Sequence, residues 1–415
     1  MKRILLLTGL ASILFSCTDK SSKVLSLSVI NVEHALQNPS RLKTSDLGKT
    51  IRYIPLETND NCLIGDNPVI KVLKNYIIVE YSASTLTTGR CLLFNKEDGR
   101  FIAEIGHVGR DPAAFSKQFS WTDEKEEFLY YERRPNQLIR YDMKGNFRGK
   151  TEFISSGSAS YYSITDSEVI GYFGGIHPSR QYVLGFFDKE GVLKDTIPLL
   201  LPKISEEIVG ISVIGARSAY EIYGNWARTG ATIIDYNNDM QAVVASNVAR
   251  IWRHNGNIRF KEDYVDTIYT VSGNKLVPSI IFHTGKYRLP VKESSSKNIS
   301  KERVFIADVS ENSNHVFFQL SKQNQDGSVL YNGLFDKNTG ETKIGKHSDG
   351  IEDDLSNFIP LSPLGMSTVG EFISLVDISV LMEWLEKHPE ERNNEKLPLI
   401  TALNEDMNPI VILIE

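Results

Sequence analysis

The chain has 415 residues, of which 41% are hydrophobic and 24% are charged. This balance supports a large folded core and excludes a chain that is disordered throughout. The length fits one large repeat domain or about two to three ordinary domains. The formal net charge is −6, and Lys and Arg do not gather in a basic stripe. We therefore exclude nucleic acid as a partner, because phosphate binding needs concentrated positive charge.

Residues 1–16 have the pattern of a lipoprotein signal peptide. Lys2 and Arg3 precede an apolar run that is long enough for a signal-peptide core but too short to span a bilayer. The run ends at Cys17, and Leu14–Cys17 resembles a bacterial lipobox. We expect lipidation of Cys17, with an ordinary signal peptide cleaved elsewhere as the alternative. Several acyl chains on one Cys would hold the protein at a membrane of the cell envelope.

The segment 17–48 is polar and weakly patterned, so we expect a lipidated tether followed by a lead-in to the folded body at 49–415. After removal of the signal peptide and use of Cys17 for the anchor, Cys62 and Cys91 remain. An oxidising compartment permits a disulfide between them, but the sequence does not fix their distance. Two buried free thiols are the alternative.

A hairpin pattern recurs through the body. An alternating apolar run ends in an aromatic residue, a polar turn with Gly or Asn follows, and a second run returns. The turns lie at 95–99, 142–146, 188–191, 271–274, 336–340 and, in degenerate form, 404–408. The first three aromatic residues, Phe94, Tyr141 and Phe187, are 47 and 46 residues apart, which is the length of one four-stranded propeller blade.

These repeats predict an all-β fold, a β-propeller of six blades. Seven blades are the alternative, because Ile233–Asp239 within the region 200–247 has the pattern of a further hairpin. The strand 51–56 has no hairpin partner of its own, and we expect it to pair with 410–414 and close the last blade. Helical spacing of Ile378, Leu381, Met382 and Leu385 predicts one short helix near 378–387, before a surface loop at 386–396.

Several motifs resemble a family of six-bladed β-propeller lipoproteins of Bacteroidota, filed as domains of unknown function and described as NHL-like. The motifs are Tyr53–Thr58, Ile105–Pro112, Asp266–Tyr269, Lys286–Pro290 and Asn408–Val411, in this order along the chain. The second resembles an IGxxGxGP loop in which Asp111 replaces the usual Gly. The resemblance covers about residues 49–415 and implies six blades and an envelope location. It supplies no catalytic residues.

The sequence contains no HExxH, Walker-type, GxSxG or CxxC motif, and no two His residues lie within four positions of each other. Two loops carry candidate binding groups. The first holds His107, Arg110 and Asp111 and is either a ligand-facing loop or an ordinary turn between blades. The second holds Asp349, Glu352, Asp353 and Asp354. It is either a Ca²⁺ site or a solvated acidic loop. No other cofactor is expected.

Aromatic side chains form a third candidate site, because exposed rings stack on sugars. The set is Trp121, Tyr161, Tyr162, Tyr172, Phe173, Tyr182, Trp226 and Trp252. The alternative is packing between blades, since Tyr and Phe favour strands.

We therefore expect a membrane-anchored extracytoplasmic binding module for a glycan, a peptide or an envelope partner protein, with the outer membrane as its expected place. A hydrolase or lyase acting on polysaccharide or peptide in the central funnel is the first alternative, and a structural or sensory component is the second. Converging His, Asp or Glu side chains at the funnel would favour the enzyme.

Overall fold

The computed structural model describes most of the chain between residue 27 and residue 415. The described ranges are 27–65, 68–81, 89–115, 119–155, 157, 159–174, 180–201, 207–214, 230–237, 240–246, 248–290, 302–324, 327–393 and 406–415. The expected signal peptide, Cys17 and Trp226 lie outside these ranges. Among the described residues, no helix is long and apolar enough to cross a membrane.

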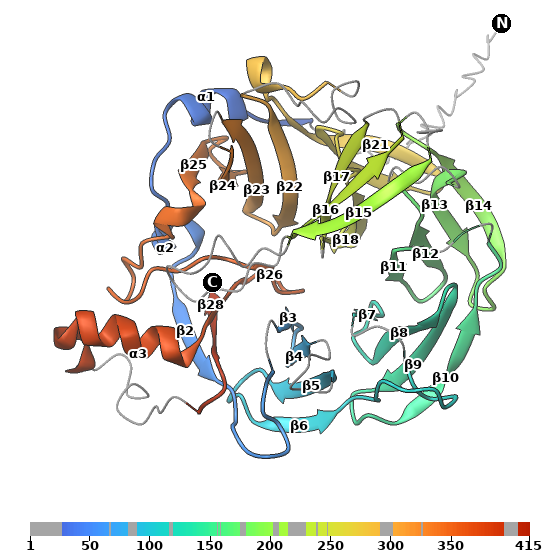
Figure 1. Cartoon of the computed structure of the whole chain (residues 1–415), viewed down its shortest axis with the longest axis horizontal. Helices are drawn as coiled ribbons and strands as arrows, with labels where there is room; N and C mark the ends of the chain where they lie inside the picture. Colours follow the sequence, from blue (N-terminus) through green and yellow to red (C-terminus); the bar gives the residue numbers. More distant parts are fainter. Residues whose placement is uncertain are drawn as a thin grey trace, which may run out of the picture.

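The strands of the described residues form seven sheets, and the larger sheets are arranged around a common centre (Figure 1). Five sheets have four strands, one has five and one has three. The all-β expectation is confirmed.

The first three sheets in chain order each consist of consecutive antiparallel strands. They comprise β3 (Val69–Val72), β4 (Tyr76–Tyr81), β5 (Arg90–Asn95) and β6 (Phe101–Glu104); β7 (Ser120–Thr122), β8 (Phe128–Arg134), β9 (Gln137–Asp142) and β10 (Phe147–Glu152); and β11 (Tyr161–Ile164), β12 (Val169–Tyr172), β13 (Tyr182–Phe187) and β14 (Leu193–Pro198).

The remaining sheets include the two that take up strands from the N-terminal part of the chain. They comprise β15 (Ile208–Ile214), β16 (Gly230–Tyr236) and β17 (Gln241–Ser246); β18 (Ile251–His254), β19 (Asn257–Phe260), β20 (Thr267–Ser272) and β21 (Lys275–Phe282) with β1 (Ser28–Ile30); β22 (Val304–Glu311), β23 (His315–Asn324), β24 (Gly327–Asp336) and β25 (Thr342–Lys346); and β26 (Gly365–Met366), β27 (Phe372–Val376) and β28 (Ile410–Ile414) with β2 (Ile51–Pro55).

Five of the six predicted hairpins are present, at β5–β6, β9–β10, β13–β14, β20–β21 and β24–β25. Four of their turns begin with Asn or Asp at the end of the first strand, namely Asn95, Asp142, Asp188 and Asp336. Each side chain accepts a hydrogen bond from a backbone N–H two residues later. This hydrogen bond takes the place of the backbone hydrogen bonds between strands where the chain reverses. The Asn or Asp residue therefore helps to fix the register of the hairpin. The sixth turn falls partly outside the described residues.

A glycine with positive φ follows in each of these turns. At Gly99, φ is +71° and a Cβ atom would collide with the carbonyl oxygen of Pro55 in β2. At Gly340, φ is +75° and a Cβ atom would meet nothing within 4 Å. The first glycine is therefore required by packing as well as by the turn, whereas the second is required by the turn alone.

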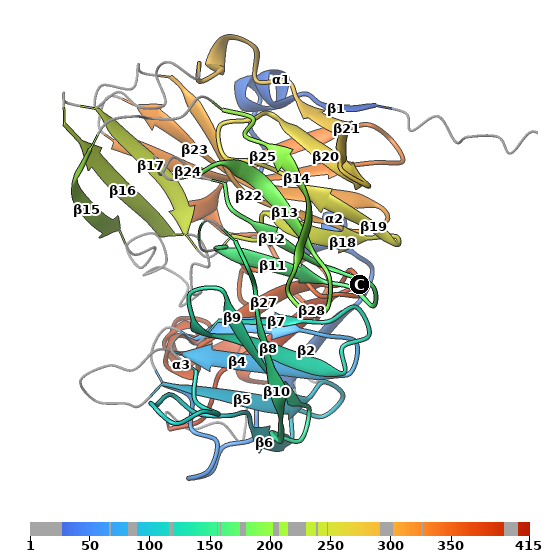
Figure 2. The ribbon, with the colours of Figure 1, turned by 90° about the vertical axis from the view of Figure 1, so that its right-hand side faces the viewer.

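The hydrophobic core lies between neighbouring sheets. One cluster joins Ile170 and Leu184 of the β11–β14 sheet to Ile251 and Phe260 of the β18–β21 sheet. These two sheets are separated in sequence by the three-stranded sheet, yet they pack directly against each other. The innermost strands β11 and β18 are also neighbours. The three-stranded sheet projects from one side of the molecule (Figure 2).

The strands expected to share the last sheet do pair. Ile51–Pro55 aligns antiparallel with Ile410–Ile414, from Ile51 opposite Ile414 to Pro55 opposite Ile410. The predicted helix is also confirmed as α3 (Ile378–Lys387), followed by the 3-10 helix η5 (Pro389–Asn393). The Asp377 side chain caps α3 by accepting a hydrogen bond from Ser379 N–H. Residues 394–396 of the expected loop lie outside the described ranges.

The boundary expected at residue 49 is wrong, because the segment 27–48 is part of the folded body. It contains β1, α1 (Val32–Gln37) and α2 (Thr44–Leu47). We call residues 28–47 the strap. β1 pairs in parallel with β21, α1 contacts β25, and α2 lies beside the acidic loop before β26. Ile30 and Leu42 of the strap are no more than 1% exposed. Ile30 packs in the core of the β18–β21 and β22–β25 sheets, and Leu42 packs in the core of the β22–β25 and β26–β28 sheets, although the strap has no regular apolar pattern.

Connections within the six larger sheets differ between the two ends of their strands. Turns that join first to second and third to fourth strands have two to five residues. In an antiparallel sheet these turns share one end, which we call the short-turn end. The longer connections leave from the opposite end, and most of them run from one sheet to another, namely 105–119, 199–250, 283–303 and 347–364, with 377–409 inside the last sheet. The connection between β8 and β9, at 135–136, is a short exception at that end.

Candidate functional site

A cavity of about 410 Å³ lies at the centre of the sheets. Its walls come from the innermost strand of each of the six larger sheets, namely β3, β7, β11, β18, β22 and β26. No described residue of β15–β17 lines it. Glu124, Glu126, Asn255 and Thr368 lie in turns at the short-turn end, so the cavity reaches that end of the molecule. We call this cavity the central pocket.

Aromatic side chains from two adjacent sheets line the central pocket. Tyr161 in β11 and Trp252 in β18 are half-buried, whereas Trp121 and Tyr162 are almost completely buried. Trp121 and Tyr162 pack edge to face, with ring centroids 5.0 Å apart. The last two rings therefore support the wall, and the first two are the ones that a ligand can reach.

Lys71 on β3 is a charged group in this wall with an internal partner. Its Nζ donates to Glu80 Oε2 at 2.6 Å and to the Ser120 carbonyl oxygen at 2.6 Å. It also lies 3.9 Å from the centre of the Phe119 ring. Glu80 is fully buried, and an ammonium beside it offsets the cost of burying its charge. The pair joins β3 and β4 to β7.

Glu311 at the end of β22 accepts hydrogen bonds from three neighbouring elements. Lys337 Nζ donates to its Oε1 at 2.7 Å, Arg259 Nε to its Oε2 at 3.2 Å, and Trp252 Nε1 to its Oε2 at 3.3 Å. The carboxylate has no exposed surface. Two cations on one carboxylate leave this group with a net positive charge, and the Glu311 carboxylate holds the Trp252 indole in place.

His254 adjoins the same carboxylate, with Nε2 at 3.4 Å from Glu311 Oε1. Burial lowers the pKa of His254, while Glu311 acts in the opposite direction. Arg253 next to it donates from Nη1 to the Ile164 carbonyl and from Nη2 to the Asp123 carbonyl, at 2.8 and 3.0 Å. Burial also lowers the pKa of the Arg253 guanidinium. Arg253 thus joins β18 to the ends of β7 and β11 at the short-turn end.

The candidate ligand loop with His107, Arg110 and Asp111 lies outside the central pocket. His107 Nε2 and Asp111 Oδ2 are 2.5 Å apart, and both side chains are about half exposed. Asp111 Oδ1 also accepts from Ala113 N–H, and Tyr141 donates to the Ala113 carbonyl. The hydrogen bond from His107 holds the pKa of Asp111 below its usual range. Within the described contacts, these groups organise their own loop.

The four carboxylates proposed for Ca²⁺ do not converge. No group of three His, Cys, Asp or Glu side chains in the described part of the chain could hold a metal ion. Asp353 is buried and accepts from Thr44, Tyr53, Leu355 and Ser356.

The other three carboxyl-bearing residues also have local partners. Asp354 accepts from Ser45 N–H at 2.9 Å, and Glu352 lies 3.4 Å from Lys43 Nζ. Exposed Asp349 accepts from Ser348 Oγ at 3.3 Å. Asp353, Asp354 and Glu352 therefore bind the strap, which the sequence pattern could not show.

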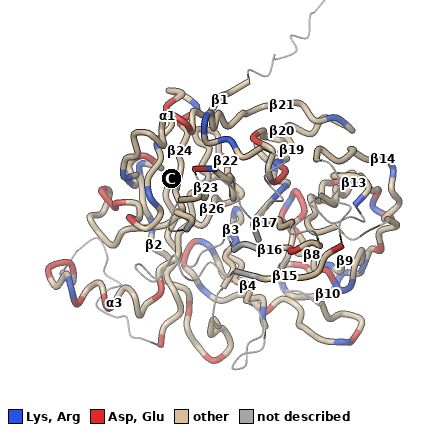
Figure 3. Tube along the Cα trace, turned by 45° about the horizontal axis from the view of Figure 1, so that its top comes forward, with Lys and Arg blue, Asp and Glu red and all other residues tan. Residues whose placement is uncertain are grey.

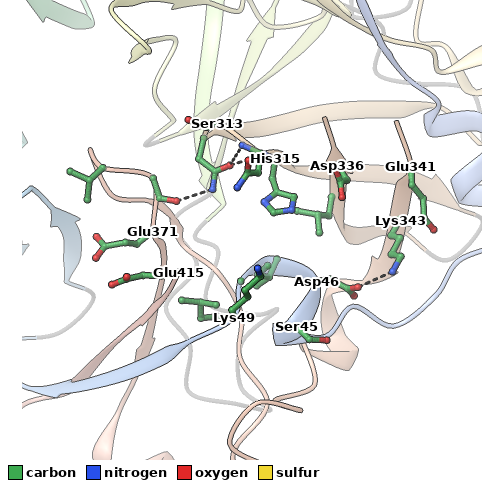
Figure 4. A pocket seen from close by; sticks show the side chains of 18 residues that line it. Ser45, Asp46, Lys49, Ser313, His315, Asp336, Glu341, Lys343, Glu371 and Glu415 are labelled. Atoms are coloured by element: carbon green, nitrogen blue, oxygen red, sulfur yellow. Dashed lines mark hydrogen bonds and ion pairs between the residues drawn. The ribbon is translucent and has the colours of Figure 1, made fainter. Parts of the chain in front are cut away.

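A larger cavity of about 740 Å³ lies at the short-turn end, between the β22–β25 sheet and the sheet of β26–β28 (Figure 4). Its walls include Asp46, Lys343, His315 and Glu371. Asp46 Oδ1 accepts from Lys343 Nζ at 2.8 Å, and Glu371 accepts from Lys96 Nζ at 2.5 Å. Both carboxylates are thus neutralised by lysines, one joining the strap to β25 and the other joining neighbouring sheets.

A buried charged cluster lies at the opposite end, around the connection from β19 to β20. Arg250 Nη2 donates to Asp263 Oδ2 at 2.7 Å, and Tyr172 donates to Glu262 Oε1 at 2.6 Å. Burial and the neighbouring Asp263 raise the pKa of Glu262 to about 7. The cluster joins the β11–β14 sheet to the β18–β21 sheet and does not line the central pocket.

The structure also decides two alternatives that the sequence left open, the pairing of the cysteines and the burial of three aromatic residues. Cys62 and Cys91 are both buried and free, so they do not form a disulfide. Tyr172, Phe173 and Tyr182 are buried between sheets. Acidic and basic residues are interspersed over the described part of the molecule (Figure 3).

The sequence profile of one family, described as Domain of unknown function (DUF4934), matches residues 27–415. The chain belongs to this family. The DUF4934 match begins at the residue before β1, so the strap is part of the family domain. None of the curated proteins matches the chain.

Solved structures resemble the DUF4934 chain in fold. A "putative exported protein" from Bacteroides fragilis is 15% identical, with a TM-score of 0.60 over 94% of this chain and 99% of that one. A member of the duf4221 family from Bacteroides vulgatus gives a TM-score of 0.41 at 12% identity, over 88% and 96% of the two chains. The WD40 repeats of RRP9 give 0.39 at 10% identity, over 90% and 98%. Because the Bacteroides fragilis protein is only 15% identical, its similarity to this chain shows a shared fold and nothing about function.

Proposed function

We propose that this DUF4934 chain is a lipid-anchored, extracytoplasmic, six-bladed β-propeller that binds a ligand in its central pocket. The lining of the pocket is the observation that carries the proposal. One innermost strand from each of six sheets contributes to it, and β15–β17 contribute no described residue. Pockets with a few oriented polar groups among apolar walls are the usual form of a ligand site.

Two contacts support a ring of six. The β11–β14 and β18–β21 sheets pack directly together, which supports a ring that does not include the three-stranded sheet. The pairing of β2 with β28 places strands from both ends of the folded body in one sheet. A closed ring of this kind has no exposed edge at the join. The three-stranded sheet is then an insertion in the connection from β14 to β18.

The envelope location rests on the N-terminal sequence. Residues 1–16 form the signal peptide, Cys17 carries the lipid, and the outer membrane is the proposed site. Ten peptide steps separate Cys17 from Leu27, so an extended tether spans at most about 35 Å. The folded body begins at the next residue, Ser28, and therefore stays close to the membrane surface.

A hydrolase or lyase is the second candidate, because His254 and Glu311 lie together in the wall of the central pocket. Binding is favoured because Glu311 is fully buried and already neutralised by Arg259 and Lys337. A general acid or base must instead reach the substrate. Incubation with candidate glycans and peptides separates the two functions, since an enzyme yields new reducing ends or amines and a binding module returns the ligand intact.

Filling the pocket tests the proposal. Thr122 is half-buried in the pocket wall on β7, and Thr122→Trp adds an indole there. We expect the full chain with this change to lose retention of envelope polysaccharides and peptides by at least about tenfold. Ser313→Trp is the matched control, because Ser313 is exposed and lines the other cavity. Unchanged retention by a folded Thr122→Trp variant would show that the central pocket is not the binding site.

A further inference from the structure

The central pocket carries information about the class of its ligand. Two ring systems, Tyr161 and Trp252, lie half-exposed on adjacent blades, and both line the cavity. The Trp252 indole is fixed by its hydrogen bond to Glu311 at 3.3 Å. A ring that is held before the ligand arrives loses little conformational freedom on binding. Flat apolar ring surfaces suit a ligand that has apolar C–H faces.

The charges of the pocket wall argue for a ligand without net charge. Lys71 pairs with Glu80, and Arg259 and Lys337 pair with Glu311. Counted with these partners, the wall is nearly balanced, because four permanent cations stand against five carboxylates, namely Lys71, Arg253, Arg259 and Lys337 against Glu80, Glu124, Glu126, Asp308 and Glu311. A phosphate or polyanion would need an excess of positive charge, and a cationic peptide would need unpaired carboxylates at the base of the pocket. Neither excess is present among the described wall residues.

Neutral polar groups complete the wall. Thr122 and Ser310 are half-buried, and Thr368 and Asn255 are exposed at the short-turn end. Hydroxyl and amide groups both donate and accept, so they suit a ligand that presents many hydroxyl groups. Pyranose sugars combine such hydroxyls with apolar C–H faces that pack on aromatic rings.

We infer that the ligand of the central pocket is a neutral carbohydrate, stacked on Tyr161 and Trp252 and hydrogen-bonded by the hydroxyl and amide groups of the rim. This inference rests on the proposed binding function and narrows it to one chemical class. The cavity of about 410 Å³ is within the range of small-molecule sites, so it holds a short segment or the end of a glycan chain.

The test uses the lipidated full chain in detergent and an array of neutral, acidic and sulfated oligosaccharides, followed by calorimetric titration with the neutral oligosaccharide that binds best. We expect Trp252→Ala and Tyr161→Ala each to weaken binding by at least about tenfold, because each removes a stacking surface. Affinity should change less than about twofold between about 0.05 and 0.5 M salt, since no charge pair forms.

Two matched variants control for loss of packing. Tyr130 belongs to the same hydrophobic cluster as Tyr161, and Trp384 is half-buried on α3, but neither lines the central pocket. Tyr130→Ala and Trp384→Ala should bind within about twofold of the unsubstituted chain. An equal loss in these controls, or binding restricted to charged glycans, would overturn the inference.

Binding of peptides distinguishes failure of the carbohydrate inference from failure of the proposed binding function. Binding of a peptide library that depends on Tyr161 and Trp252, without binding of any neutral oligosaccharide, would overturn the carbohydrate inference and leave the binding function intact. The absence of any ligand that depends on pocket residues would overturn both.

Discussion

Single residues in this protein show how burial decides what a polar side chain does. His347 is 4% exposed and lies between two neutral partners, with Nδ1 at 2.9 Å from Asn332 Oδ1 and Nε2 at 3.4 Å from Ser362 Oγ. Burial lowers the pKa of His347 to about 4. The folded protein therefore keeps this imidazole neutral at pH values where the unfolded chain has protonated it.

The sign of the pH effect follows from that shift. The free energy of unfolding should fall as pH decreases from about 6.5 to about 4, and His347 accounts for about 3 kcal/mol of the loss. His347→Gln should remove this contribution, as measured by urea unfolding at each pH. His34→Gln is the control, because His34 is exposed. An unaltered pH dependence in His347→Gln would contradict the assignment.

Glu262 acts in the opposite sense. Its pKa is raised to about 7, so its contribution to stability is present below about pH 4.5 and is lost as pH rises through about 7. The pH dependence of the unfolding free energy of the parent protein therefore combines His347 and Glu262. The contribution of His347 alone is the difference between the parent and the His347→Gln variant.

Residue patterns in the sequence predicted the fold better than they predicted the binding groups. The Asx–Gly turns are local, so Asn95 with Gly99 and Asp336 with Gly340 could be assigned to hairpins from sequence alone. The wall of the central pocket combines side chains from six sheets, such as Lys71 and His254, and no short motif relates them. Acidic Asp353 resembled a metal ligand, but two of its hydrogen-bond donors are Thr44 and Tyr53, about 300 positions away.

At the scale of elements, the three-stranded sheet differs most from its surroundings. Its edge strand β15 exposes Val209 and Ile211, at 65% and 64%. The sheets on either side of it in sequence share a core that does not include it. The sequence pattern correctly predicted a hairpin in 230–246, since β16 and β17 pair antiparallel. A strand pattern does not show whether the resulting sheet is a blade of the propeller.

Deletion of the three-stranded sheet tests the proposal that it lies outside the ring of blades. Replacement of 202–247 by a short Gly/Ser linker should preserve cooperative unfolding, with a midpoint shift below about 5 °C, because Ile251 and Phe260 keep their packing on Leu184. Thermal unfolding followed by circular dichroism measures the shift. Deletion of β7–β10 is the control and should abolish folding. Loss of cooperative unfolding in the linker variant, or a much larger midpoint shift, would contradict the proposed place of the sheet outside the ring.

At the scale of the whole molecule, the proposed lipid anchor on Cys17 would hold the central pocket at a membrane. We expect Cys17→Ser to abolish incorporation of a labelled fatty acid and to move the protein from the membrane fraction to the soluble fraction, because the acyl chains supply the membrane affinity. Cys62→Ser is the matched control. Cys62 is buried and donates to the Glu57 carbonyl, which a hydroxyl can also do. Membrane retention of Cys17→Ser would contradict the lipid anchor.

The strap also determines how the molecule bears mechanical load. A pull on a tether that precedes residue 27 reaches β1 first, and then the packed side chains of Ile30, Leu36 and Leu42. The strand β2, which pairs with β28, lies further along the chain and is reached last. With the proposed anchor on Cys17, tension from the membrane would be distributed over the three sheets that the strap contacts. The strap would therefore carry the force before it reaches the pairing of β2 with β28.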